Sequence, residues 1–223
     1  RTLRSERVKV SKDGLTVQAM PAGYKSGTKK LGGARVTAAT AMMASYQPEP
    51  QFVACVKATA PYEREKTPIA YWEMTVLEAT EKVMTIGFTH EDFPLNRYHP
   101  GWCLDSYAYH NDDGSCFHVK APIPDHGLQW GPRFTTGDVV GAGINFQTNE
   151  VFFTKNGKFL GVAYRGVTGN AFYATISFGS VGAKAKVNCG RKPFKFSFAV
   201  PTLSWTKLGH TSYSPLAFVP HPD

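Results

Sequence analysis

The sequence predicts an all-β fold, a sandwich of two packed antiparallel sheets. Short runs rich in β-branched and aromatic residues alternate with turn residues along most of the 223 positions, as in all-β proteins. No long segment has a convincing helical period, and no helical crossover separates the runs, so neighbouring strands are expected to pair antiparallel. The length suits one large domain, since a chain of this size buries roughly 70–75% of its unfolded surface.

The first elements in chain order are a possible helix and a predicted hairpin. TAATAMMASY, residues 37–46, is the best helix candidate because of its Ala and Met content, and it ends before two prolines. The strands YWEMTVLE (71–78) and VMTIGFT (83–89) follow. Only ATEK separates them, so the sequence predicts that they pair as a hairpin.

The later elements are predicted strands separated by turn residues. DSYAYH (105–110) and SCFHV flank NDDG, a turn in which Gly114 can take a positive φ. DVVGAGINF (138–146) is a buried strand whose glycines suggest close packing or a bulge. EVFFT and KFLGVAY are expected to pair around Asn156–Gly157, because both turn residues can take φ > 0. FYATISF (172–178) and KAKVNC (184–189) complete the set.

The net charge of +8 is concentrated at one end of the chain. Residues 1–35 contain nine Lys or Arg against Glu6 and Asp13, and the remainder is nearly neutral. This basic segment could contact phosphates or acidic partners, or it could be a solvated arm without a ligand. We divide the chain into a basic N-terminal segment (1–50) that packs partly on the domain, a β domain (51–198), and a tail with several prolines (199–223).

The chain shows no membrane or secretion signal. No apolar run approaches the ~18 residues that cross a bilayer, and the charged N-terminus is not a signal peptide. It also lacks an initiator Met, which suggests a fragment. The four cysteines are scattered without a C-x-x-C pair, so we expect free thiols in a reducing compartment, the cytoplasm and/or nucleus.

Two clusters could be mistaken for chemical sites. His110, Asp112, Asp113 and His118 bracket NDDG, but a hairpin explains them better than a metal site does. Cys103, Asp105 and Ser106 lie near His99, yet a nucleophile needs an oriented base and an oxyanion hole, which proximity in sequence does not supply. The glycines of FTTGD and GVTGN precede strands, whereas phosphate loops open helices. We therefore predict no catalytic residue, no metal, no cofactor and no enzyme.

The order of these motifs resembles a SPRY domain. The motifs YWEMTV, TIGFT, PGW, SYAYHNDDG, FTTGDVVGAGINF, VFFTKNGKFLGVAY, FYATISF and VNCGRKPFKF follow one another as in that family, densely from about Tyr71 to Phe198. The chain is most similar to the RanBPM-like branch, the relatives of the Ran-binding protein in the microtubule-organising centre. The resemblance implies a bent sandwich of two antiparallel sheets, a concanavalin-like jelly roll, with residues 51–198 as the SPRY domain.

The resemblance also implies a protein-interaction module whose loops at one end of the sandwich bind a peptide or protein epitope. Its branch implies a scaffold or substrate receptor of a CTLH/GID-type ubiquitin ligase. The corresponding loops are Lys57–Thr67, Phe93–Trp102 and Gly179–Gly182, and the last lacks the tryptophan of some peptide-binding relatives. We expect exposed partner-binding residues in these loops, namely Lys57, Tyr62, Arg64, Arg97, Tyr98, His99, Ser180 and Val181.

Two other readings remain open at this point. One is a chromatin- or RNA-associated SPRY protein whose basic N-terminal segment contacts nucleic acid, which steep salt dependence would reveal. The other is a secreted effector built on the same fold. We expect protein partners and neither nucleic acid nor a membrane.

Overall fold

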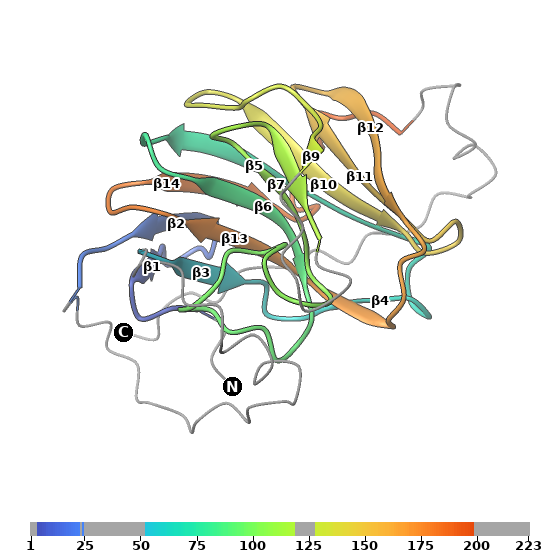
Figure 1. Cartoon of the computed structure of the whole chain (residues 1–223), viewed down its shortest axis with the longest axis horizontal. Coiled ribbons are helices and arrows are strands. Elements are labelled where there is room, and N and C mark those ends of the chain that lie inside the picture. Colours follow the sequence, from blue (N-terminus) through green and yellow to red (C-terminus); the bar gives the residue numbers. More distant parts are fainter. Residues whose placement is uncertain (1–3, 23, 25–51, 119–127, 199–223) are drawn as a thin grey trace.

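The computed structural model describes residues 4–22, 24, 52–118 and 128–198 of the chain. Two antiparallel sheets pack on each other (Figure 1), and these residues contain no helix. The predicted all-β sandwich is therefore confirmed. The helix candidate at 37–46 and the proline-containing tail lie outside the described residues. The described part contains no helix long and apolar enough to cross a membrane.

The first sheet has the order β3-β13-β6-β7-β8-β9, with β4 pairing beside β3 on β13. Its strands are β3 (Ala54–Lys57), β4 (Tyr62–Glu63), β6 (Met84–Thr89), β7 (Tyr107–His110), β8 (Ser115–Phe117), β9 (Leu128–Gln129) and β13 (Ala171–Phe178). The predicted hairpin around NDDG is present as the pair β7–β8.

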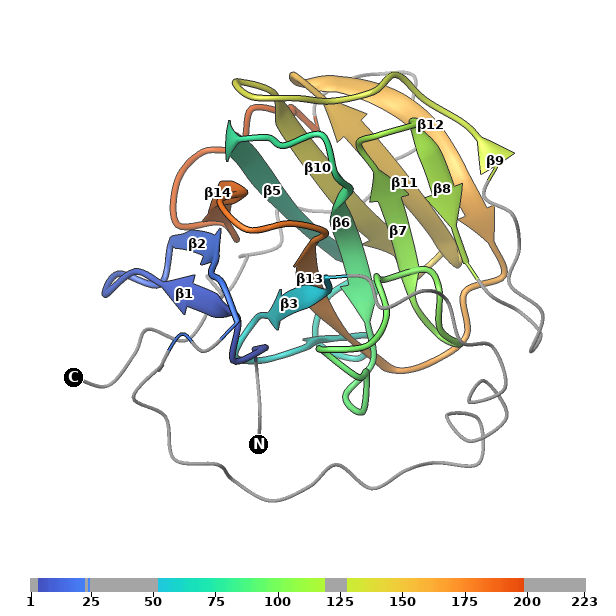
Figure 2. The same cartoon turned by 60° about the vertical axis from the view of Figure 1, so that its left-hand side comes forward.

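The second sheet has the order β1-β2-β14-β5-β10-β11-β12. Its strands are β1 (Val8–Val10), β2 (Thr16–Ala19), β5 (Ile69–Glu78), β10 (Val139–Asn145), β11 (Glu150–Lys155), β12 (Lys158–Arg165) and β14 (Lys184–Asn188). Figure 2 shows the sheet curving from β1 at one edge to β12 at the other. Two strands of the basic N-terminal segment thus extend this sheet.

The core lies between the sheets because apolar residues alternate along the strands. On β5, Trp72, Met74 and Val76 point inward and are buried, and they meet residues such as Ile86 and Phe178 from the first sheet. Full burial of one such side chain contributes about 1.5–3 kcal/mol. A single continuous core results, and it fixes which strand residues are left to face outward.

The hairpin at Asn156–Gly157 is confirmed. Asn156 has φ 53° and Gly157 has φ 80°, the two positive values that a two-residue turn between twisted strands requires. The Asn156 side chain also accepts a hydrogen bond from the Val139 backbone N–H and donates one to Asp138. Close packing at the β10 glycines is confirmed as well, since a Cβ on Gly143 would lie 2.0 Å from the Phe152 ring.

The predicted hairpin between residues 71–78 and 83–89 is wrong. Strand β5 pairs with β10 and β14, whereas β6 pairs with β13 and β7, so the two strands belong to different sheets. ATEK is therefore a connection between sheets. It contains no Gly or Asn for the positive φ values of a tight turn, and both strands are buried on both faces, as central strands of a sandwich are.

The segment after β14 crosses the outer face of the second sheet. Phe194, Phe196 and Phe198 surround the Tyr71 ring, with ring centroids 4.8, 5.7 and 5.0 Å away. The Glu73 carboxylate accepts hydrogen bonds from the backbone N–H groups of Lys195 and Phe196. Residues 190–198, here called the strap, therefore cover the part of this face around Tyr71 and Glu73.

Candidate binding surface

The three predicted loops do not share one end of the sandwich. Lys57 pairs with Thr175 and β4 pairs with Ala171 and Phe172, so the loop Lys57–Thr67 lies where β13 begins. The turn Gly179–Gly182 follows the other end of the same strand. Phe93–Trp102 lies over the outer face of the first sheet, between the two ends. The expectation of one common end is therefore wrong, because the loop at the start of β13 and the loop at its end lie at opposite ends of the sandwich.

In the loop Lys57–Thr67, Arg64 is held by the protein itself. Its guanidinium donates to the backbone oxygens of Phe146 (2.6 Å), Val167 (3.1 Å) and Gly169 (3.1 Å), and to the Asn149 side chain (2.7 Å). It also lies 4.9 Å from the centroid of the Phe146 ring. Arg64 thereby joins three loops at this end, using the fork of donors that distinguishes Arg from Lys.

Two other predicted residues near this loop are buried. The Lys57 ammonium donates to the Glu91 carbonyl oxygen and lies 4.7 Å from the Tyr173 ring centroid, so it anchors the start of the next loop. The Tyr62 hydroxyl donates to the Tyr71 carbonyl oxygen, and its ring packs edge-on against Phe88. Both side chains support the fold, and the expectation that they are exposed is wrong.

The segment 90–106 covers the outer face of the first sheet. The Cys55 N–H donates to the Leu95 carbonyl oxygen, and Cys55 packs with Phe93, Leu95, Tyr98 and Cys103 in a small separate core. The outward side chains of the strands beneath are hydroxyls, which pair as Thr85–Ser177 and Thr89–Thr175. This polar layer supplies hydrogen-bond partners to the loop above it, although one buried atom of that loop, His99 Nε2, has none.

Tyr98 and His99 are part of this cover, and their side chains are buried. His99 Nδ1 lies 2.7 Å from the Ser177 hydroxyl, and His110 Nε2 lies 3.1 Å from the Pro100 carbonyl oxygen. Burial lowers the pKa of His99 to about 3 and that of His110 to about 4, so both rings are neutral at neutral pH. Arg97 is exposed and lies over the Tyr98 ring.

The third loop forms a surface together with a segment that sequence reasoning missed. In the turn Gly179–Gly182, the Gly179 N–H donates to the Val83 carbonyl oxygen, and the Ser180 hydroxyl lies 2.5 Å from that of Thr80. The prediction that ATEK is a hairpin turn gave no reason to expect Thr80 and Val83 beside this loop. The absence of Gly and Asn from ATEK was the available signal against the hairpin.

This end also carries the exposed apolar side chains. Among the described residues, the exposed large hydrophobic side chains are Leu77 (39%) and Val181 (47%). Leu77 lies near the end of β5, where Glu78 pairs with Lys184 just after the turn. We call Leu77, Thr80, Val83, Ser180 and Val181 the turn-end surface. It combines exposed apolar groups with the hydroxyls of Thr80 and Ser180, which bond to each other and can instead bond to a partner.

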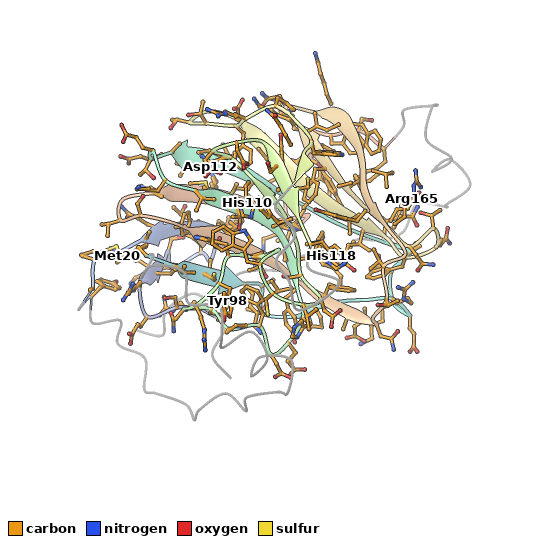
Figure 3. All side chains as sticks on the ribbon, in the orientation of Figure 1. Met20, Tyr98, His110, Asp112, His118 and Arg165 are labelled. Atoms are coloured by element: carbon orange, nitrogen blue, oxygen red, sulfur yellow. The ribbon has the colours of Figure 1, made fainter. Side chains whose placement is uncertain are left out.

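The residues considered for metal binding are engaged elsewhere. His110 bonds to Pro100, His118 Nδ1 lies 3.1 Å from the Ser106 carbonyl oxygen, and Asp113 caps the Ser115 N–H. Figure 3 shows His110 between Asp112 and His118 rather than the three converging. No group of three or more His, Cys, Asp or Glu in the described part of the chain is placed to hold a metal ion.

The residues considered as a nucleophile and its base, Cys103, Ser106 and His99, do not bond to one another as such a site requires. The Ser106 hydroxyl donates to the Cys103 carbonyl oxygen and accepts from the Gly101 N–H, whereas His99 bonds to Ser177. Burial raises the pKa of the Cys103 thiol to about 11, so it is not a thiolate at neutral pH. These residues order the PGW loop.

The eight predicted partner-binding residues thus fall into three groups. Lys57, Tyr62, Tyr98 and His99 have buried side chains, which contradicts the expectation that they are exposed. Arg64 is half-buried and bonded within the protein. Arg97, Ser180 and Val181 are at least partly exposed, and their contact with a partner stays a prediction.

A family model and several known proteins match the chain. The family model described as SPRY domain matches residues 69–192. The Ran-binding proteins 9/10 homolog of Drosophila melanogaster is 40% identical over 127 residues, which are 56% of this chain and 13% of that protein. Ran-binding protein 9 of Homo sapiens is 35% identical over 157 residues, 70% of this chain and 21% of that protein. The chain therefore spans less than a quarter of either relative.

The fold is similar to that of solved structures. A crystal structure of a human SPRY domain superposes with a TM-score of 0.61 at 21% identity, covering 84% of this chain and 98% of that one. The jelly-roll sandwich expected from the sequence is therefore confirmed at the level of fold.

Proposed function

The chain belongs to the SPRY domain family, whose members are protein-interaction modules, and from this premise we propose that it binds a peptide or protein epitope through the turn-end surface. One observation carries the choice of surface. The exposed large apolar side chains of the described residues, Leu77 and Val181, both lie at this end. Exposed apolar groups next to hydroxyls are typical of interaction sites.

The wider role that we propose is that of a scaffold or substrate receptor in a CTLH/GID-type ubiquitin ligase, without catalytic activity of its own. The relatives named Ran-binding protein 9 and 9/10 homolog support this branch, and the ligase role itself follows from the resemblance to that branch. The proposed domain covers residues 51–198, with β1 and β2 packed on it. Cytoplasmic or nuclear localisation accompanies the proposal, and four buried free cysteines are compatible with a reducing compartment.

The experiment is a capture assay with purified CTLH ligase subunits and the 223-residue chain as bait. Leu77→Asp combined with Val181→Asp should abolish most of the capture, because two charges replace the exposed apolar groups. Both sites are exposed, so the melting temperature should change little. Arg165→Asp is the matched control, since it makes the same change in net charge at an exposed position, at the end of the second sheet opposite Leu77. Undiminished capture by the double variant would overturn the choice of surface, and no capture by the wild type would overturn the ligase role.

A further inference from the structure

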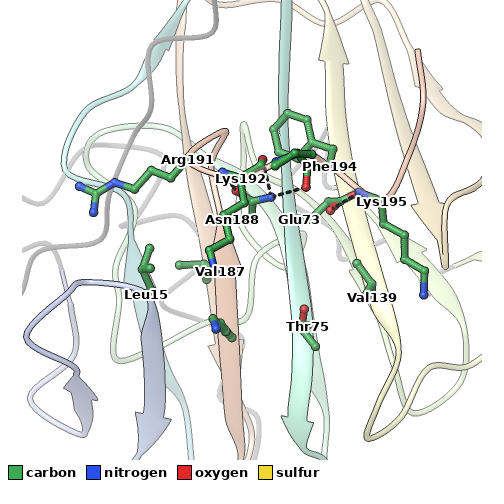
Figure 4. Close-up of a pocket in the computed structure, with 12 residues that line it drawn as sticks. Leu15, Glu73, Thr75, Val139, Val187, Asn188, Arg191, Lys192, Phe194 and Lys195 are labelled. Carbon is green, nitrogen blue, oxygen red and sulfur yellow. Dashed lines mark hydrogen bonds between the residues drawn. The ribbon is translucent and has the colours of Figure 1, made fainter. Parts of the chain in front are cut away.

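The outer face of the second sheet contains a basic groove beside the strap. It has a volume of about 310 Å³ and lies between the strap and strands β14, β5 and β10 (Figure 4). Its floor is made by Leu15, Thr75 and Val139. Four basic side chains line it, namely Lys186, Arg191, Lys192 and Lys195. All four are exposed.

Local sequence explains why these charges gather here. Lys186 faces outward because Ala185 and Val187 on either side of it point into the core. The Asn188 side chain accepts hydrogen bonds from the N–H groups of Gly190 and Lys192 and donates to the carbonyl oxygens of Lys192 and Pro193. This closed turn holds Arg191 and Lys192 at the rim. Figure 4 shows Arg191 on one side of the groove and Lys195 on the other.

The four cations of the groove outnumber the carboxylates beside them, which are Glu73 in the lining and Asp13, whose charge acts on Lys186. None of the four forms an ion pair with another described residue, although Arg191 makes a long hydrogen bond of 3.4 Å to the Asp13 carbonyl oxygen. The nearby carboxylates have other partners. Glu73 accepts from the Lys195 and Phe196 N–H groups and from the Tyr71 hydroxyl, and Asp13 accepts from Ser11 and from the Leu15 N–H.

The neighbouring pair Lys155–Asp138, at 3.1 Å, is by contrast already neutral. Because residues 36–223 are close to neutral in total, the four cations of the groove form a local excess of positive charge within that part of the chain.

We propose that this groove is a second docking site, separate from the turn-end surface, and that it binds an acidic, extended peptide segment of a protein partner. Charge complementarity carries the proposal, because four cations without ion-pair partners surround a shallow aliphatic floor. The undescribed residues of this chain do not supply such a segment, since their acidic residues are Glu49, Asp125 and Asp223, which lie far apart in the sequence. A partner peptide fits better than nucleic acid, because Leu15 and Val139 in the floor are aliphatic and the aromatic residue of the lining, Phe194, is partly buried with its ring packed edge-on against Tyr71, 4.8 Å between centroids.

The test measures fluorescence anisotropy of a labelled peptide of alternating Glu and Ala with the 223-residue chain. The probes for comparison are a Gln/Ala peptide of the same length and a single-stranded oligonucleotide of equal charge. We expect the Glu/Ala peptide to bind, the Gln/Ala peptide not to bind, and the affinity to fall as salt rises. The double variant Lys186→Glu with Lys192→Glu should weaken binding by about tenfold or more, which corresponds to about 1.4 kcal/mol.

The matched control is Lys66→Glu with Arg133→Glu, which changes the net charge equally at exposed positions away from the groove. It should retain wild-type affinity, and melting temperatures should show that both variants fold. Equal losses in the two variants would overturn the proposal by showing that only overall charge matters. Tighter binding of the oligonucleotide than of the peptide would overturn it in favour of a nucleic-acid site. Absence of peptide binding to the wild type would also overturn it.

Discussion

Replacing Arg64 by Ala should lower stability without removing a partner contact. The change deletes hydrogen bonds to four acceptors, three of them backbone oxygens, and the contact with the Phe146 ring. Arg64 is half-buried, so water can partly replace it at these oxygens, and each bond is worth nearer 0.5–1 kcal/mol than the value for a buried charge. We expect a loss of about 2–3 kcal/mol, or roughly 4–12 °C in melting temperature for a chain of this size.

The assay compares urea unfolding of Arg64→Ala, Arg64→Lys and Arg97→Ala. Arg64→Lys should recover only part of the loss, because a point charge cannot reach acceptors in several directions. Arg97→Ala is the matched control, since Arg97 is exposed, and it should stay within about 0.5 kcal/mol of the wild type. The reasoning is refuted if Arg64→Ala keeps the wild-type midpoint while losing partner capture. Arg64 would then be a binding residue, as the sequence suggested.

Three further predictions follow from other parts of the structure. Gly157→Val should lower the free energy of unfolding by about 1–3 kcal/mol because Gly157 has a positive φ. The loss should exceed that of Gly137→Val, since a Cβ at 157 would lie 2.8 Å from the Lys195 carbonyl oxygen whereas a Cβ at 137 would face open space; equal urea midpoints of the two variants would contradict this. The free energy of unfolding should fall as pH drops from about 6.5 towards 5. His99 and His110 have pKa values of about 3 and about 4 in the folded chain, so the unfolded chain binds their protons first. A constant urea midpoint over that pH range would argue against it. Iodoacetamide should label the four cysteines only after unfolding, since burial raises the pKa of each thiol, and rapid labelling of the native chain in mass spectra would disprove their burial.

Those parts of the fold that depend on local pattern could be predicted from the sequence. Asn156–Gly157 determines its own hairpin because the turn geometry needs residues that accept positive φ. Alternation along DVVGAGINF gives a central strand, and its glycines accommodate Tyr71 and Phe152 from the neighbouring strands. The SPRY resemblance rests on these same motifs, and the match over residues 69–192 confirms it.

The partners of a strand could not be predicted in the same way. A short polar connection such as ATEK is compatible with a hairpin or with a crossing to the other sheet, and the choice depends on which strands lie on either side of β5. Likewise, Tyr98 and His99 are polar-tipped residues in a loop, which suggests exposure. Burial of His99 depends on Ser177, 78 positions away, whose hydroxyl faces outward from the first sheet.

The same long-range dependence decides where partners can bind. Because segment 90–106 already occupies the outer face of the first sheet, that face is unavailable beneath its cover, and the strap occupies part of the opposite face. Two surfaces of the described residues that lack such a cover are the turn-end surface and the basic groove. Their chemistries differ, since one offers apolar side chains and hydroxyls and the other offers four cations. One partner with an apolar anchor followed by an acidic stretch could use both, because Leu77 and Thr75 face outward from the same strand, two residues apart.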